Sequence, residues 1–521
     1  MRNRLGAAAM PSEPDPIPRP LDHLALAGAR ETPALIDKGG VLDHAALDRL
    51  VGVLAAALRA RGLAPGDRVA SWLPKDRLAC LLPLAAARAG AVHVPVNPLL
   101  KHRQVAHILA DSGARLLITG RGRADTIEAS DRPAACSVLI EEDEGAALLA
   151  AAEALPPSAA DPAELAAILY TSGSTGLPKG VMLSHANLWL GAVSVAHYLG
   201  LAADDRTLAV LPLSFDYGQN QLLSTWAAGG CVHPLDYLTP RDVVRAIGRH
   251  AITTLAGVPP LWTQLAEVEW PAESVAPLRR LTNTGGRMSV PLVRRLRALF
   301  PDARLFSMYG LTEAFRSTYL DPALIDEHPD SIGSAIPLAE ILVVRSDGSL
   351  ADDGEPGELV HAGPLVAQGY WQDAARTAQR FRPAPAASRY GGVAVWSGDT
   401  VVRDAAGLLR FVGRDDEMIK SSGNRISPTE IEEAAIASGA AAEAVALGIA
   451  DDRLGQTILL YARPAGENAA QRLDDWFKRN LPSFMKPAQV IWRDELPRNA
   501  NGKLDRAVLK AETGLRAETG A

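Results

Sequence analysis

The stretch YTSGSTGLPKG, residues 170–180, gathers glycines, hydroxyl side chains and a lysine directly after the apolar run AAIL. Glycines permit positive φ and close backbone approach, while hydroxyls and bare amide N–H groups donate hydrogen bonds. Lys179 adds a positive charge. Together these groups suit a polyphosphate. The alternative is an ordinary surface loop, because clusters of glycine, serine and threonine are common in loops.

The spacing excludes two common phosphate loops. A Walker loop needs glycine directly before its lysine and serine or threonine directly after it. Here Pro178 precedes Lys179 and Gly180 follows it. A dinucleotide fingerprint needs Gly-x-Gly-x-x-Gly opening a helix, and this spacing is absent as well.

Length and composition bound the class of protein. The chain has 521 residues, of which 48% are hydrophobic and 22% charged, as in an ordinary soluble globular protein. A chain of this length is too long to fold around a single hydrophobic core, so we expect at least two domains. The net charge of -7 argues against nucleic acid as a partner, because phosphate backbones select basic surfaces.

Cysteine usage and hydropathy indicate a cytoplasmic enzyme without a membrane span. The three widely spaced cysteines, Cys80, Cys136 and Cys231, form neither a zinc motif nor a disulfide framework. The most apolar stretch, 78–96, contains an arginine and two prolines and predicts a buried helix followed by a strand. Residues 1–20 lack a signal-peptide pattern and are expected to be a loose tail, with Met10 as an alternative start.

Short apolar runs alternate with helical patterns along most of the chain. Leucines and valines at spacings of three and four predict a helix that Asp43 caps and Gly62 ends. This alternation favours α/β layers with largely parallel sheets. Past about residue 335 the pattern becomes β-like, and residues 141–164 read as a surface helix and linker. Strands are predicted within 66–74, 114–120, 206–213, 252–260, 278–286 and 303–310.

Six ordered motifs identify the chain as a member of the adenylate-forming superfamily, which contains acyl-CoA synthetases, adenylation domains of nonribosomal peptide synthetases, and luciferases. YTSGSTGLPKGV resembles its signature loop, and NTGGRM resembles its adenine loop. MYGLTE is similar to its Tyr-Gly-x-Thr-Glu motif. WSGD resembles Tyr-x-Thr-Gly-Asp, with Ser397 in place of threonine. The segments 413–432 and 497–506 match its last two motifs.

The resemblance implies a fold and its domains. We expect an α/β protein: a large N-terminal domain of layered α/β sheets with a small β-barrel-like part, and a small mobile α+β C-terminal domain. The expected boundaries are a tail at 1–20, the large domain at 21–414, the small domain at 415–510, and a tail at 511–521.

The resemblance also implies an ATP-dependent, AMP-forming acid–thiol ligase that uses Mg²⁺. A carboxylate would attack the α-phosphate of ATP, and a thiol would then displace AMP. Thr312 would contact the α-phosphate, and Glu313 would help to bind Mg²⁺, which prefers oxygen ligands. The residues expected to hold the β- and γ-phosphates are Thr171, Ser172, Gly173, Ser174, Thr175, Gly176 and Lys179.

Further roles follow from the later motifs. Tyr309 would pack against adenine near Gly285 and Gly286. Lys503 would reach the α-phosphate and the substrate carboxylate from the small domain. The remaining expected residues are Asp399 and Arg414 for the ribose, Asp416 as the hinge about which the small domain rotates, and Lys420 and Gly423 on the thiol side.

Several alternatives stay open at this point. A non-catalytic nucleotide-binding homologue is one, although Lys179, Glu313, Asp399 and Lys503 are all present. Luciferase-like oxidation is another. The thiol could belong to CoA or to a separate carrier protein. The sequences LSFDYGQNQL and YGLTEAFRSTYL resemble those of ligases associated with exosortase systems. They also resemble sequences of stand-alone aminoacyl–carrier-protein ligases.

The pair Phe215-Asp216 bears on the acid substrate. Peptide-synthetase adenylation domains have Phe-Asp at the matching place, where the aspartate pairs with the substrate's α-ammonium group. An unpaired carboxylate in an acyl pocket is costly, so Asp216 suggests an amine-bearing acid. Alternatively, Asp216 caps a helix beginning near Gly218 and the acid is fatty or aromatic. Arg316 on the pocket wall could favour a second carboxylate or pair with Asp216.

Overall fold

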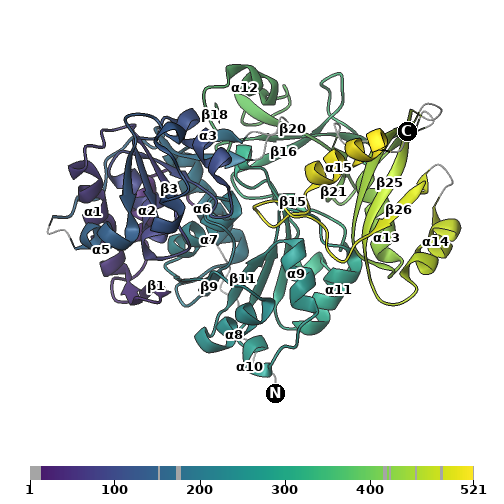
Figure 1. The fold of residues 1–521 in the computed structure, drawn as a ribbon, viewed down its shortest axis with the longest axis horizontal. Helices are drawn as coiled ribbons and strands as arrows, with labels where there is room; N and C mark the ends of the chain where they lie inside the picture. Colours follow the sequence, from purple (N-terminus) through teal and green to yellow (C-terminus); the bar gives the residue numbers. More distant parts are fainter. Residues whose placement is uncertain are drawn as a thin grey trace.

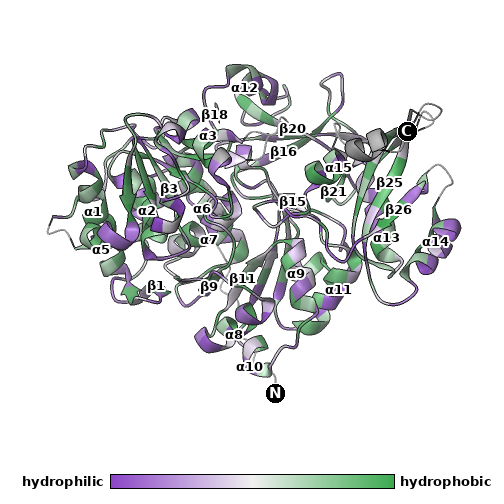
Figure 2. Ribbon diagram, in the orientation of Figure 1, coloured by the Kyte–Doolittle hydropathy of each residue, from purple (hydrophilic) through white to green (hydrophobic). Residues whose placement is uncertain are grey.

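The computed structural model describes residues 13–150, 153–171, 178–414, 419–421, 424–451, 455–481 and 485–519. The chain folds as a large α/β domain followed by a smaller α+β domain, which lies to the right in Figure 1. Strands are mainly apolar, whereas outer helices such as α8 and α14 carry hydrophilic faces (Figure 2).

A nine-stranded sheet forms one layer of the large domain, and its central strands run parallel. Its order is β15-β14-β13-β12-β11-β9-β10-β1-β2, with antiparallel strands at both ends. The strands are β1 (Pro33–Asp37), β2 (Gly40–Asp43), β9 (Arg206–Ala209), β10 (Cys231–Pro234), β11 (Thr254–Gly257), β12 (Arg280–Asn283), β13 (Arg304–Tyr309), β14 (Thr318–Tyr319) and β15 (Ser334–Ala335).

A seven-stranded sheet forms the second layer, in the order β18-β8-β7-β4-β3-β5-β6. Strands β4, β3, β5, β6 and β7 pair in parallel, and β8 and β18 add antiparallel strands. The strands are β3 (Arg68–Trp72), β4 (Val92–Pro95), β5 (Leu116–Thr119), β6 (Ser137–Ile140), β7 (Leu165–Thr171), β8 (Lys179–Ser184) and β18 (Gly369–Tyr370). The predicted strands and their parallel pairing are confirmed.

Helices connect the strands of both sheets. The first begins after Asp43, whose side chain accepts a hydrogen bond from the Ala46 N–H, as the sequence predicts. The helices are α1 (His44–Ala60), α2 (Arg77–Arg88), α3 (His102–Ser112), α4 (Arg121–Ala124), α5 (Glu141–Leu149), α6 (His185–Leu199), α7 (Asp216–Ala227), α8 (Pro240–His250), α9 (Pro259–Ala266), α10 (Ala272–Val275) and α11 (Val290–Leu299), with 3-10 turns η1 (Leu21–Leu26), η2 (Ala129–Asp131), η3 (Thr312–Ala314) and η4 (Pro322–Leu324).

The β-rich part expected past residue 335 is a five-stranded antiparallel sheet. Strands β16, β17, β20 and β19 are neighbours in that order, and β21 pairs with β20. Its elements are β16 (Glu340–Val344), β17 (Pro356–Ala362), α12 (Ala374–Arg380), β19 (Phe381–Pro383), β20 (Val393–Arg403) and β21 (Leu409–Arg414).

The small domain has a hydrophobic core of its own, which includes Ile431, Leu460 and Phe477. Residues 511–519 form the last part of helix α15, and their alanines, glutamates and leucine are good helix formers. The elements are β22 (Ile419–Ser421), β23 (Asn424–Ile426), α13 (Pro428–Ala437), β24 (Ala441–Asp451), β25 (Gly455–Pro464), α14 (Ala469–Asn480), β26 (Gln489–Trp492) and α15 (Arg506–Thr519).

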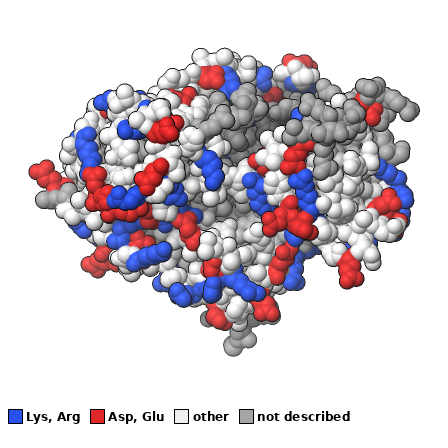
Figure 3. Space-filling view, in the orientation of Figure 1, with Lys and Arg blue, Asp and Glu red and all other residues white. Residues whose placement is uncertain are grey.

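The surface carries both signs of charge without a large basic patch on the face seen in Figure 3, and this face is hollowed near its centre. None of the helices in the described part of the chain is long and apolar enough to cross a bilayer.

Candidate active site

Three of the predicted site residues of the large domain follow the carboxyl ends of neighbouring parallel strands. Gly285 follows β12, and Thr312 follows β13. Asp216 begins α7, the helix that follows β9. Because β9, β11, β12 and β13 are adjacent and parallel, their carboxyl ends meet at one edge. Ligands bind at this edge in open α/β sheets.

The glycine-rich loop joins two antiparallel strands. Thr171 ends β7 and pairs in register with Lys179, the first residue of β8. The Thr171 Oγ1 atom is buried and has no hydrogen-bond partner in the structure. An orphaned hydroxyl at the mouth of this loop fits a phosphate acceptor, because buried polar groups are normally satisfied. Residues Ser172, Gly173, Ser174, Thr175 and Gly176 lie outside the described residues.

Lys179, Glu313 and Tyr370 form one buried cluster. The Lys179 Nζ donates to Glu313 Oε1 at 3.1 Å and to the Tyr370 hydroxyl at 2.7 Å. The Tyr370 hydroxyl donates to the same Glu313 oxygen at 2.6 Å. Burial by itself raises the pKa of Glu313, but Lys179, the Tyr370 hydroxyl and Arg380 outweigh it and lower the pKa overall. Glu313 is therefore held as a carboxylate.

This carboxylate fits a magnesium ion bound to phosphates. Within the part of the chain that the structure describes, no group of three or more His, Cys, Asp or Glu side chains could hold a metal ion. Magnesium is commonly bound by one or two carboxylates together with substrate phosphates and water. Glu313, beside the lysine that follows the glycine-rich loop, would supply such a ligand.

The residues predicted to contact the ribose and adenine also lie together. The Tyr309 hydroxyl donates to Asp399 Oδ2, and Asp399 pairs in register with Arg414 across β20 and β21. The Ser397 Oγ accepts a hydrogen bond from the Asp399 N–H at 3.1 Å. The serine that replaces the family's threonine thus keeps the hydroxyl that orients Asp399. The Arg414 side chain lies outside what the structure describes.

Lys503 enters the site from the small domain. A Cβ atom on Gly285, whose φ is 80°, would lie 2.9 Å from the Lys503 Cε. Only glycine therefore admits the lysine here without rearrangement. The Lys503 Nζ lies 5.0 Å from the centre of the Phe215 ring, next to Asp216. Gly286 follows Gly285 in this loop and lies against Pro259, the first residue of α9.

Asn97 of the large domain holds the loop that carries Lys503. Its Nδ2 atom donates to the Ala500 carbonyl at 2.8 Å and to Asn501 Oδ1 at 3.0 Å. Asn499 closes the same loop by accepting a hydrogen bond from the Lys503 N–H at 3.1 Å. A second contact between the domains joins Arg287 to Glu433. These contacts fix Lys503 in the site.

Asp216 lies where the acid substrate is expected. Its Oδ1 accepts a hydrogen bond from the Thr312 Oγ1 at 3.4 Å, and its Oδ2 lies 3.8 Å from the Arg316 Nη1. Burial raises the pKa of this carboxyl overall, although Arg316 and Lys503 act to lower it. The capping interpretation is wrong as stated, because α7 begins at Asp216 itself and the residue before it, Phe215, makes no side-chain cap.

Three thiol-side and hinge expectations cannot be placed. Asp416 and Gly423 lie outside the described residues, and Lys420 belongs to β22 with its side chain undescribed. These roles stay predictions.

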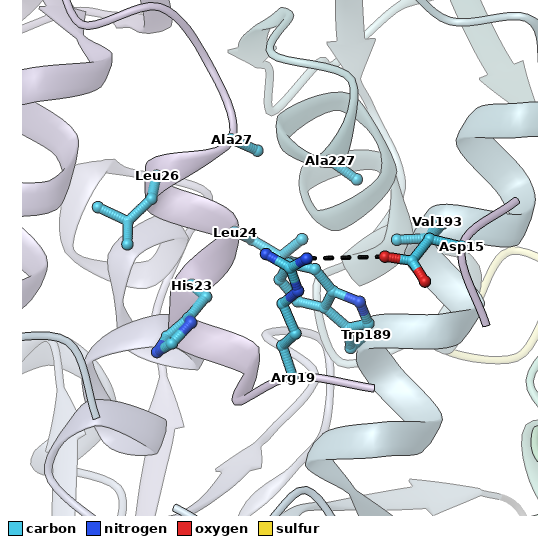
Figure 4. A pocket seen from close by; sticks show the side chains of 9 residues that line it. All are labelled: Asp15, Arg19, His23, Leu24, Leu26, Ala27, Trp189, Val193 and Ala227. Atoms are coloured by element: carbon cyan, nitrogen blue, oxygen red, sulfur yellow. Dashed lines mark ion pairs between the residues drawn. The ribbon is translucent and has the colours of Figure 1, made fainter. Parts of the chain in front are cut away.

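A hollow of about 250 Å³ lies elsewhere, between η1 and α6. Figure 4 shows Arg19 beside Trp189 and ion-paired with Asp15 across this hollow. None of the predicted site residues lines it.

Sequence reasoning missed Asn97, Tyr370 and Arg380. Tyr370 belongs to the short strand β18, and its hydroxyl reaches Glu313 from 57 positions away. Only the run GYW, between β-like segments, marks it in the sequence. No local pattern points to Asn97, because its partners lie some four hundred residues further on.

Comparisons with known proteins agree with this geometry. The family model described as "AMP-binding enzyme" matches residues 23–371, and the model "AMP-binding enzyme C-terminal domain" matches residues 430–503. The chain belongs to this family, within the adenylate-forming superfamily.

Three similar proteins illustrate the range of the family. A "Feruloyl-CoA synthase" from an Amycolatopsis species is 32% identical over 92% of this chain and 94% of its own. An "L-proline--[L-prolyl-carrier protein] ligase" from Pseudomonas fluorescens is 31% identical over 91% and 95%. A solved structure of "O-succinylbenzoate Coenzyme A Synthetase (MenE)" from Bacillus subtilis, in complex with ATP and magnesium, is 27% identical, with a TM-score of 0.81, over 95% and 99%. The chain is thus an AMP-forming ligase.

Proposed function

We propose that this ligase activates an amino acid, and that the buried carboxylate of Asp216 binds its ammonium group. ATP is the cosubstrate and Mg²⁺ the cation. A carboxylate oxygen of the amino acid bonds to the α-phosphorus, and pyrophosphate leaves. The sulfur of a thiol then bonds to the acyl carbon, AMP leaves with the former carboxylate oxygen, and the thiol proton is released.

The incomplete pairing of Asp216 carries this proposal. Its side chain is 5% exposed, and the 3.8 Å to Arg316 exceeds the 2.7–2.9 Å typical of a charge-assisted hydrogen bond. A buried carboxylate with partial pairing is costly, and a cationic partner removes the cost. The substrate's ammonium group is that partner.

Charge placement along the site supports the same orientation. Thr312 links Asp216 to the segment expected at the α-phosphate, and Lys503 lies beside Phe215. An ammonium group on Asp216 therefore leaves the α-carboxylate near Lys503, where a cation stabilises the charge that develops during attack. Catalysis of this half-reaction rests on such preorganised charges rather than on an acid–base pair.

The thiol acceptor carries a phosphopantetheine arm, either as free CoA or on a carrier protein. The similarity to the proline–carrier-protein ligase supports a carrier protein and an amino acid, whereas the similarity to feruloyl-CoA synthase supports CoA.

ATP–pyrophosphate exchange tests the proposal. Each amino acid is assayed beside the acid that lacks its amino group, so the two differ only at the ammonium group. We expect exchange with an amino acid and exchange at least tenfold slower with its desamino partner. Faster exchange with fatty, aromatic or desamino acids contradicts the proposal. Intact-mass measurement of thioesters then separates CoA from a carrier protein as acceptor.

A further inference from the structure

One face of α7 carries buried polar groups that the protein does not satisfy. Asp216, Gln219 and Asn220 stand at positions i, i+3 and i+4 and share this face. The side chains of Gln219 and Asn220 are nearly fully buried. Gln219 Nε2 and Asn220 Oδ1 have no hydrogen-bond partner in the structure. A missing partner at several neighbouring buried groups points to a polar ligand.

Arg316 lies beside this set, with its Nη1 atom 3.8 Å from Asp216 Oδ2 and its guanidinium close to the Tyr198 hydroxyl. Its side chain is 2% exposed, and its Nε and Nη2 atoms are buried without hydrogen-bond partners. Its guanidinium lies 4.8 Å from the centre of the Tyr217 ring, next to Asp216 in the chain.

The backbone is strained at Phe315, the residue directly before Arg316. Phe315 has a φ of 60°, which is unusual for a bulky residue, and its ring packs against Gly191, where a Cβ would lie 2.4 Å from it. Such strain persists only where the surrounding structure enforces it, and it gathers at binding sites.

Neighbouring buried polar groups show what satisfied groups look like in this domain. Gln221, also on α7, accepts from the Leu211 N–H and donates to the Leu208 carbonyl. Arg280 of β12 donates to the Leu199 carbonyl at 2.7 Å and to Asp205 at 2.6 Å. Unpaired buried polar atoms also occur elsewhere in this domain, as at Thr254, Trp262 and Asn283. Those of Gln219, Asn220 and Arg316 gather around Asp216.

We infer that the amino acid bears a carboxylate at the end of its side chain, and that Arg316 binds this carboxylate. The inference rests on the proposed function. The ammonium group then faces Asp216, the reacting carboxylate faces Lys503, and the second carboxylate receives the free Nε and Nη2 donors as a two-point pair. Gln219 and Asn220 supply further amide donors and acceptors. Each charge of the substrate meets its opposite.

An apolar side chain would leave these groups buried and unpaired. A site built to hydrogen-bond its substrate rejects an analogue without that group by about 10⁴-fold, much more than a hydrophobic pocket discriminates. We therefore expect fatty acids, and amino acids with aromatic or aliphatic side chains, to be poor substrates.

Six related acids test the inference in ATP–pyrophosphate exchange with the full chain. Glutamate is compared with glutamine, norleucine and glutarate, and aspartate and 2-aminoadipate cover the chain length. We expect an acidic amino acid to give the highest kcat/KM, at least about 10²-fold above norleucine. Highest activity with norleucine or another apolar amino acid overturns the inference and leaves amino acid activation standing. Highest activity with glutamine overturns the inference that the substrate side chain ends in a charged carboxylate.

The same experiment separates the two proposals. Equal rates with glutarate and glutamate overturn the role of Asp216 in binding an ammonium group, while the assignment of Arg316 stands. Arg316→Met and Arg316→Lys then test the arginine, with thermal unfolding as a check on folding. We expect both to reduce the preference for the acidic amino acid over norleucine by about tenfold or more, because lysine lacks the planar fork. An unchanged preference in Arg316→Lys, the variant that keeps the charge, overturns two-point binding.

Discussion

The Nζ atom of Lys503 lies 5.0 Å from the centre of the Phe215 ring, so a lysine of the small domain lies beside the residues of the large domain that are predicted to bind the acid. Gly285 makes room for it. The structure therefore shows the arrangement that suits the first half-reaction, in which a cation is needed where the two anions meet.

Lys503→Ala should slow adenylate formation by about 10²–10³-fold, the usual cost of removing one preorganised charge-stabilising group. Thioester formation from preformed adenylate should change little, because the resemblance assigns that half-reaction to the rotated small domain. Single-turnover rates for the two half-reactions measure this. Equal losses in both half-reactions would contradict the prediction that Lys503 acts in adenylate formation alone.

Asn97→Asp should slow adenylate formation by about tenfold, because a small displacement of a catalytic group is costly. The substitution keeps the Oδ1 that accepts the Leu99 N–H, and it replaces the donor to Ala500 and Asn501 with a charged oxygen that these two acceptors repel. Thioester formation should be unaffected. If both rates match wild type, the loop carrying Lys503 does not depend on Asn97.

Glu313→Gln should raise the Mg²⁺ concentration needed for half-maximal adenylation by about tenfold or more, because neutral amide oxygen is a weaker ligand for a hard cation. Glu355→Gln is the matched control, since Glu355 pairs with Arg345 at the surface. A magnesium titration that is unchanged in Glu313→Gln would remove Glu313 from the metal site.

Tyr309→Phe should raise the KM for ATP by roughly 3–10-fold, the value of one hydrogen bond, while the KM for the acid stays the same. The variant keeps the ring and loses only the donor to Asp399. An effect on the acid KM alone would contradict the placement of adenosine at this pair.

Local patterns predicted what depends on local physics. The helix after Asp43 and the central strands follow from periodicity and capping, and the parallel order places Thr312 and Gly285 at one edge. The contacts of Asn97 with Asn501 and of Tyr370 with Glu313 could not be predicted, because they depend on how distant segments pack. Motif spacing alone also left the start of α7 two residues late, which suggested a capping role for Asp216.

Asp216 provides the most direct test of amino acid activation. The measurement is kcat/KM in pyrophosphate exchange for the best amino acid and for its desamino analogue, in wild type and in Asp216→Asn. Asparagine keeps the shape of the side chain and removes its charge. The account predicts a wild-type preference of about 10²-fold for the amino acid, the value of a buried charge-assisted contact, and a preference of only a few-fold in the variant. An equally strong preference in Asp216→Asn would contradict it.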